Sequence, residues 1–229
     1  MNDDSKTSLD GINNYGRELS SDDIKNKVHI QFVGGMWGDI GKLQLQFLKE
    51  NGLEPRHKLA DIGCGCLRGG LHQIRYLDSN NYYGLDINTS LIEAGKTEIV
   101  AENLMQKKAN LLVDDKFKVT KFNILFDYII SVSLFTHLPM NMIIRCLKEV
   151  KLSLKPEGKY YSTFFMSDTS ANTEQIAQKP GGKKTNYDSD PFHYSKEEIE
   201  IMANLADLKV TIIGEWKHPR NQKMVKFYS

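Results

Sequence analysis

Short apolar runs alternate with amphipathic segments along most of this chain, and that alternation limits its fold more than any other feature. Seven runs have the length and composition of buried strands, namely 58–63, 81–87, 110–113, 126–135, 159–165, 209–214 and 224–229. Helical spacing of apolar residues predicts helices over about 39–51, 67–78, 89–108, 139–154 and 195–205. Strands that alternate with helices form parallel sheets, because a parallel crossover needs a dozen or more residues.

The last two runs are the exception to this parallel order. Only residues 215–223 separate them, which is too short for a crossover helix, so the pair should be antiparallel. The sequence therefore predicts an α/β fold, with a doubly wound, Rossmann-like, mostly parallel seven-stranded sheet and an antiparallel last strand. In such sheets ligands bind at the carboxyl ends of the strands.

Two polar segments flank or interrupt this pattern. Residues 1–38 are rich in Gly, Asn, Asp and Ser, so we expect an N-terminal cap or flexible leader before a main domain over 39–229. The connection 167–194 is long and polar, and connections of that length are usually either functional lids or disordered. It ends at a capping box, Ser195 with Glu198, that predicts the start of the last helix.

Composition excludes several classes of protein. The 229 residues carry 30 Lys and Arg against 29 Asp and Glu, a net charge of +1, which argues against binding nucleic acid by bulk electrostatics. No run approaches the roughly 18–20 apolar residues of a membrane span, and the N-terminus lacks the apolar segment of a signal peptide. We therefore expect a cytoplasmic protein, a monomer or homodimer, whose partner is a small molecule rather than a nucleic acid or a membrane.

The three cysteines, Cys64, Cys66 and Cys146, predict neither disulfides nor a metal site. Their number is odd, and Cys64 and Cys66 are too close together to bridge each other without strain. A Cys-x-Cys pair can bind metal, but no cluster of Cys or His follows at zinc-site spacing.

The most informative motif is the run Asp61-Ile62-Gly63-Cys64-Gly65, where a predicted strand ends and a helix follows. Its glycines permit a tight turn and the close approach of a ligand to the backbone. About 20 residues further on, Asp86 ends the next strand, where a carboxylate can accept both hydroxyls of a ribose. The pair indicates a nucleoside-containing cofactor.

Two classes of cofactor share these features. A dinucleotide site has a third glycine in its fingerprint, but Arg68 stands in that place. Asp61 would also repel a pyrophosphate, whereas it suits a ligand that has an ammonium group and no phosphate. S-adenosylmethionine has a ribose, an adenine, a sulfonium and an amino-acid tail, so the charges favour it.

These residues resemble the class I S-adenosylmethionine-dependent methyltransferases, over residues 36–229. The resemblance is carried by residues 61–65, 83–87, 114–117, 126–131 and 154–159. More narrowly, residues 133–138 and 218–222 are similar to a bacterial branch that methylates small molecules. Leu67 departs from the pattern, because many members have a glycine there.

The resemblance and the motifs together give a set of candidate site residues. For S-adenosylmethionine, with S-adenosylhomocysteine as product, we expect contacts from Trp37, Asp61, Gly63, Cys64, Gly65, Asp86, Ile87, Asp115, Phe117 and Ser131. For the methyl acceptor we expect Arg68, Phe135, Tyr194 and Arg220. Structural roles stay open for Trp37 as a core residue, Asp115 as a solvated acid and Arg68 as a salt-bridge partner.

His137 is the candidate catalytic residue, because it follows the fourth strand where an acceptor approaches the sheet. It would act as a base or orient the acceptor, and a purely structural hydrogen bond is the alternative. The function predicted is methyl transfer to a polar small molecule, by O-methylation of a sugar, sugar phosphate or secondary metabolite, with a nitrogen as the alternative atom. A protein or RNA methyltransferase, a non-catalytic regulatory protein that binds the cofactor, and a dinucleotide oxidoreductase are the alternatives.

Overall fold

A central sheet organises the computed structural model, which describes residues 11–168 and 173–229. Its strands are β1 (Leu59–Ile62), β2 (Tyr82–Asp86), β3 (Asn110–Val113), β4 (Phe126–Ser131), β5 (Leu154–Met166), β8 (His193–Tyr194), β9 (Lys209–Gly214) and β10 (Lys223–Tyr228). Their order is β3-β2-β1-β4-β5-β10-β9, with the two-residue β8 paired to the end of β5. The first five strands are parallel, and β10 is antiparallel to both of its neighbours. The predicted sheet is confirmed.

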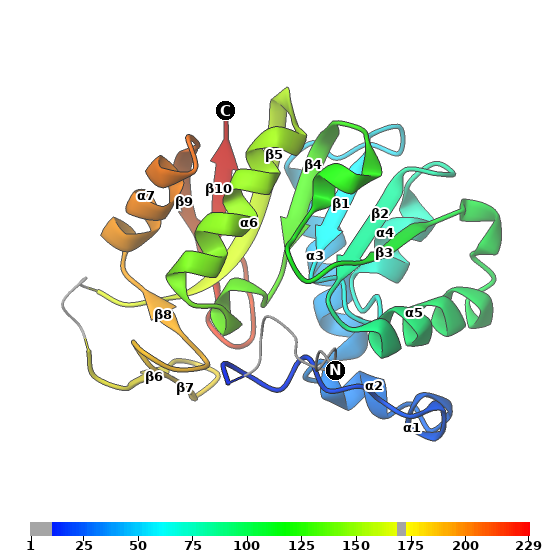
Figure 1. Cartoon of the computed structure of the whole chain (residues 1–229), viewed down its shortest axis with the longest axis horizontal. Helices are drawn as coiled ribbons and strands as arrows, with labels where there is room; N and C mark the ends of the chain where they lie inside the picture. The colour runs from blue at the N-terminus through cyan, green and yellow to red at the C-terminus, as the bar shows by residue number, and fades with distance from the viewer. Residues whose placement is uncertain (1–10, 169–172) are drawn as a thin grey trace, which may run out of the picture.

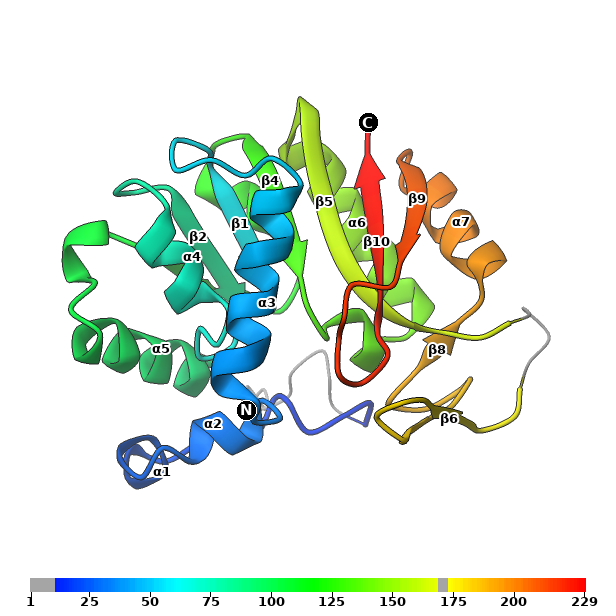
Figure 2. The same cartoon turned by 180° about the vertical axis from the view of Figure 1, so that it is seen from behind.

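Helices cover both faces of the sheet. They are α1 (Ser21–Lys25), α2 (Val28–Phe32), α3 (Trp37–Glu50), α4 (Gly70–Tyr76), α5 (Thr89–Ala101), α6 (Met140–Ser153) and α7 (Lys196–Leu205). Figure 1 shows α6 and α7 in front of the sheet, and Figure 2 shows α3 and α4 in front of the opposite face. Apolar residues of α3, α4 and α5 pack in one core cluster, and those of α6 and α7 pack in another.

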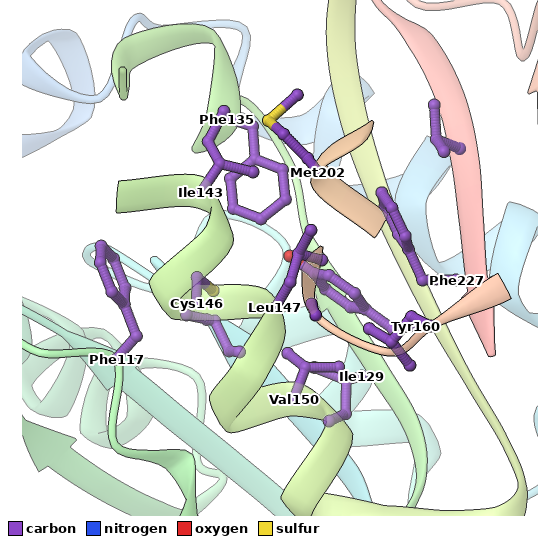
Figure 3. Packing of buried hydrophobic residues seen from close by; sticks show 14 of the residues in the cluster. Phe117, Ile129, Phe135, Ile143, Cys146, Leu147, Val150, Tyr160, Met202 and Phe227 are labelled. Atoms are coloured by element: carbon purple, nitrogen blue, oxygen red, sulfur yellow. The ribbon is translucent and has the colours of Figure 1, made fainter. Parts of the chain in front are cut away.

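The core under α6 shows how the sequence pattern becomes packing. Ile143, Leu147 and Val150 recur at helical spacing and are fully buried against Ile129 of β4 and Tyr160 of β5 (Figure 3). Burial of one such side chain stabilises the fold by about 1.5–3 kcal/mol. This rigid layer fixes the carboxyl end of β4, from which His137 follows.

Several predicted boundaries of helices are wrong, and local geometry explains them. Helix α3 begins at Trp37 rather than after Asp39, because the chain turns at Met36 in a left-handed conformation. Helix α5 ends at Ala101, well before the predicted 108. Asn103 is left-handed there, and the Leu104 N–H donates back to the Ile99 carbonyl.

Two predicted strands also differ from the observed ones. The run 126–135 leaves the sheet after Ser131, because Ser133 adopts a positive φ and a 3-10 helix follows over Phe135–His137. The strand predicted to begin at 159 begins at Leu154 instead, which pairs with Phe126 of β4. A hairpin of β6 (Ile176–Gln178) and β7 (Lys183–Thr185) lies within the polar connection 167–194.

The N-terminal segment and the β6–β7 hairpin lie along the same edge of the sheet (Figures 1 and 2). The parallel strands end at this edge, so both segments are placed to cover whatever binds there. Residues 1–10 and 169–172, parts of the predicted leader and lid, lie outside the described residues. Within the ranges 11–168 and 173–229, no helix combines the length and the apolar character that crossing a membrane requires.

Candidate active site

A cavity lies at the carboxyl ends of β1, β2 and β4. Its lining residues are Asn13, Tyr15, Val33, Gln44, Asp61, Gly63, Cys64, Gly65, Cys66, Arg68, Gly69, Asp86, Ile87, Leu91, Val132, Ser133, Leu134, His137 and Leu138. A second, apolar pocket shares Gly63, Asp86, Ile87, Leu134 and Leu138 with it and adds Leu85, Asp114, Asp115 and Phe117. The shared residues make the two cavities neighbours along one wall of the site.

The glycine turn after β1 forms the floor of the cavity. Gly63 and Gly65 have φ values of +76° and +53°, a conformation that side chains disfavour. A Cβ on Gly63 would lie 3.0 Å from Leu134, and one on Gly65 would lie 3.3 Å from Val33. The turn is held to β2, because the N–H groups of Gly63 and Cys64 both donate to the Leu85 carbonyl.

Asp86 is placed by two backbone hydrogen bonds. One carboxylate oxygen accepts the Gly65 N–H at 2.8 Å, and the other accepts the Asn88 N–H at 2.9 Å. Burial raises the pKa of Asp86, and these bonds oppose that shift. Because a carboxylate has about four acceptor positions, both oxygens can still accept hydrogen bonds from a ligand diol.

Asp61 lies at the end of β1, 5% exposed, and accepts the Tyr82 hydroxyl at 3.0 Å. Burial raises the pKa of Asp61 to about 7, and the negative charge of Asp86 adds to this effect. A cationic group in the cavity would favour the ionised carboxylate. Asp61 is therefore suited to an ammonium or sulfonium ligand rather than to an anion.

His137 forms a pair with Asp190 at the mouth of the cavity. The imidazole Nδ1 lies 2.5 Å from the Asp190 carboxylate, and Nε2 lies 3.3 Å from the Tyr15 hydroxyl. The two side chains are 19% and 24% exposed, respectively. A carboxylate that accepts from Nδ1–H leaves the Nε2 lone pair available as a base.

The N-terminal segment closes over this pair. Asn88 donates its two amide hydrogens to the carbonyls of Tyr15 and Arg17, and Asn13 donates to the His137 carbonyl. The Tyr15 ring lies 4.7 Å from the imidazole, so the segment forms one wall of the site.

Comparisons with known proteins agree with this fold. Residues 60–160 match the sequence model of a family described as a methyltransferase domain, from β1 to the first half of β5. This match identifies a methyltransferase domain over residues 60–160 of the chain. Solved structures with the same fold contain bound S-adenosylmethionine or S-adenosylhomocysteine.

Solved structures with low sequence identity share the fold. A methyltransferase from Clostridium acetobutylicum has 11% identity and a TM-score of 0.64 over 91% of this chain and 99% of its own. The CcbJ methyltransferase from Streptomyces caelestis has 13% identity and a TM-score of 0.64 over 85% and 91%. Magnesium protoporphyrin IX methyltransferase from Synechocystis, with bound cofactor, has 10% identity and a TM-score of 0.59 over 93% and 87%.

The residues present fit the cofactor of this methyltransferase. The cavity holds one buried carboxylate suited to a diol and another suited to an ammonium group, and the adjoining pocket presents Ile87 and Phe117 to a flat ring. Asp114 and Asp115 both line this pocket, and the Asp114 carboxylate accepts the N–H groups of Lys116 and Lys118. Among the described residues there is no group of three or more His, Cys, Asp or Glu that could hold a metal ion.

The structure places some predicted site residues away from the cavity. Trp37 starts α3 and packs edge-on to the His29 ring. Ser131 is fully buried, and its hydroxyl lies 2.8 Å from that of Tyr160. Phe135 and Tyr194 are buried in the core, where the Tyr194 hydroxyl donates to the Leu138 carbonyl.

Sequence reasoning missed Asp190, Gln44 and Val33. Asp190 lies in the polar connection, 53 residues from His137, and no local pattern distinguishes it from neighbouring acids. Gln44 did carry a signal, because it is a polar residue at helical spacing from the apolar Ile40, Phe47 and Leu48 of α3. Val33 lines the cavity from the segment where Trp37 was expected to do so.

Proposed function

We propose that this enzyme methylates a hydroxyl oxygen of a polar small molecule such as a sugar, a sugar phosphate or a secondary metabolite. The Asp190–His137 pair carries the proposal, because an alcohol acceptor must lose its proton and a positioned base is needed for that step. The Tyr15 ring lies 4.7 Å from the imidazole, and this cover favours a small acceptor over a protein or an RNA.

The cofactor's contacts follow from the chemistry of the lining residues. In this proposal Asp86 accepts hydrogen bonds from the ribose hydroxyls, and Asp61 accepts hydrogen bonds from the ammonium group. The turn residues Gly63, Cys64 and Gly65 approach the cofactor through their backbone. Ile87, Asp115 and Phe117 line the place for adenine, in the apolar pocket beside Asp86. S-adenosylmethionine supplies an electrophilic methyl group and its leaving group, so the protein mainly positions the reactants.

His137 supplies the acid–base chemistry. Asp190 accepts the hydrogen of Nδ1, which fixes the ring and directs Nε2 toward the acceptor. As the oxygen–methyl bond forms and the sulfur–methyl bond breaks, Nε2 accepts the hydroxyl proton. That proton later returns to solvent. The Tyr15 hydroxyl lies 3.3 Å from Nε2 in this structure, so the acceptor hydroxyl takes its place there.

Turnover by variants of this pair tests the proposal. Wild-type enzyme, His137→Gln and Asp190→Asn are incubated with methyl-labelled S-adenosylmethionine and a metabolite extract, and labelled products are measured by mass spectrometry. We expect turnover to fall by about 10²-fold or more in both variants, with affinity for S-adenosylhomocysteine nearly unchanged. The control is His57→Gln, a histidine before the amino end of β1.

The alternatives predict other outcomes. Turnover within a few-fold of wild type in both variants would make the pair structural and remove the basis for the proposal. Cofactor binding without any labelled product would favour a non-catalytic regulatory role. Label transferred to protein or RNA in the extract would favour a macromolecular acceptor.

A further inference from the structure

Two arginines from distant parts of the chain bind the same turn, and one of them, Arg68, lines the cavity. Arg68 precedes α4 and donates through Nη1 to the carbonyls of Val33 and Gly35, at 3.0 and 3.1 Å. Arg220, from the loop between β9 and β10, donates through Nη2 to the Gly34 carbonyl at 2.7 Å. Three successive carbonyls of one turn therefore hold both guanidinium groups.

Among the described residues, this arginine pair, Arg68 with Arg220, has no carboxylate partner. Within residues 11–168 and 173–229, no Asp or Glu oxygen lies within 4.0 Å of either guanidinium. Arg68 is 9% exposed, and arginines so deeply buried are normally paired. Burial and the charge of Arg220 lower the pKa of Arg68, which indicates that the two positive charges act on each other.

Much of the hydrogen-bonding capacity of the pair is unused. A guanidinium has five N–H donors. In the part of the chain that the structure describes, Arg68 uses only Nη1 and Arg220 uses only one bond from Nη2. Planar guanidinium groups with unused N–H donors match the geometry of a carboxylate or a phosphate.

His218 adds a further polar group beside the pair. It is 4% exposed, and its Nδ1 accepts the Arg220 backbone N–H at 3.2 Å. Burial and the charges of Arg68 and Arg220 lower the pKa of His218 to about 3, so it is neutral and Nε2 carries the hydrogen. No hydrogen-bond partner for Nε2 exists among the described residues.

Tyr15 relates this pair to the proposed base. Its hydroxyl contacts His137, and its ring is one wall of the cavity that Arg68 also lines. Burial and the charge of Asp190 raise the pKa of Tyr15, whereas Arg220 and Arg68 act in the opposite direction. Tyr15 therefore contacts the proposed base and is within the electrostatic influence of the arginine pair.

We propose that the arginine pair binds an anionic group of the methyl acceptor, so that the molecule methylated is a hydroxylated carboxylate or phosphate. The inference rests on the proposed function and deepens it, because it names the class of acceptor. The hydroxyl lies at His137, and the anionic group lies at Arg68 and Arg220. The other possible source of an anion is the carboxylate of the cofactor's amino-acid tail.

Calorimetry on the full chain distinguishes the two sources. The enzyme saturated with S-adenosylhomocysteine is titrated with inorganic phosphate and with malonate, at an ionic strength held constant with chloride. We expect both anions to bind, and Arg220→Gln to weaken them by about tenfold or more, because charge-assisted hydrogen bonds are lost. The control Arg145→Gln, at an exposed position on α6, should change binding less than twofold.

Three results would overturn the proposal. The first is that neither anion binds to the wild-type complex, and the second is that Arg220→Gln binds them as well as wild type. The third is that Arg220→Gln loses affinity for S-adenosylhomocysteine but not for 5′-methylthioadenosine, which has no amino-acid tail. That loss would assign the pair to the cofactor.

A second variant covers the case in which Arg220→Gln does not fold. Arg220→Lys keeps the charge but loses the planar fork, so it should weaken phosphate binding by about threefold or more. Affinity equal to wild type in a folded Arg220→Lys protein would then contradict the proposal. This experiment measures binding of the anion, whereas the turnover of His137→Gln tests the proposed base. The two proposals can therefore fail independently.

Discussion

Replacing Asp61 with Asn should stabilise the enzyme without ligand while weakening its hold on the cofactor. A rise in the pKa of Asp61 from 3.8 to about 7 corresponds to about 4 kcal/mol, at 1.36 kcal/mol per unit. Because the folded pKa is the higher one, this side chain costs stability progressively between pH 4 and pH 7. Above pH 7 the cost is constant. Asn cannot ionise, and its amide oxygen can still accept the Tyr82 hydroxyl.

Urea unfolding at pH 4 and pH 8 measures this effect. We expect the two proteins to have similar free energies of unfolding at pH 4, and Asp61→Asn to be more stable by up to about 4 kcal/mol at pH 8. Affinity for S-adenosylhomocysteine should fall by roughly 1.5–3 kcal/mol, the range for hydrogen bonds to charged groups. The control is Asp207→Asn, whose side chain is 95% exposed and whose left-handed backbone also suits Asn.

Either of two results would show that the buried charge of Asp61 does not destabilise the fold. One is an Asp61→Asn protein that is less stable than wild type at pH 8. The other is a stability difference between the two proteins that stays the same from pH 4 to pH 8, since burial of the charge would then not be its cause.

Two further predictions concern neighbouring residues. Asp86→Ala should weaken S-adenosylhomocysteine binding by roughly 1.5–3 kcal/mol in calorimetry, and unchanged affinity in a folded variant would remove Asp86 from the ribose site. Asn88→Ala removes both hydrogen bonds that hold the carbonyls of Tyr15 and Arg17, so limited proteolysis should cleave residues 11–20 faster than in wild type. Equal cleavage rates would show that Asn88 does not hold this segment.

Local signals in the sequence predicted the sheet and its helices well. The Ser195–Glu198 capping box predicted the start of α7, and both of its hydrogen bonds are present. The short connection between the last two strands predicted their antiparallel pairing. Boundaries were less predictable where backbone conformation decides them, because nothing in the residue types required the turns at Met36 and Ser133.

The candidate site was predictable where it follows a strand directly. Asp61, Gly63 and Asp86 were found because the fold brings strand ends to one edge of the sheet, and the structure places all three in the cavity. Asp190 was not found, because its pairing with His137 depends on how the connection 167–194 folds back. Phe135 was assigned to the acceptor from its position in the chain, but it is completely buried.

Methyl transfer from S-adenosylmethionine to a hydroxylated anion tests the account most directly. The measurement is a screen of hydroxy acids and sugar phosphates with methyl-labelled cofactor, with the labelled atom located by NMR. The account predicts an O-methylated anionic product that wild type forms and His137→Gln forms at least about 10²-fold more slowly. A product methylated on nitrogen, or one formed equally well by His137→Gln, would contradict it.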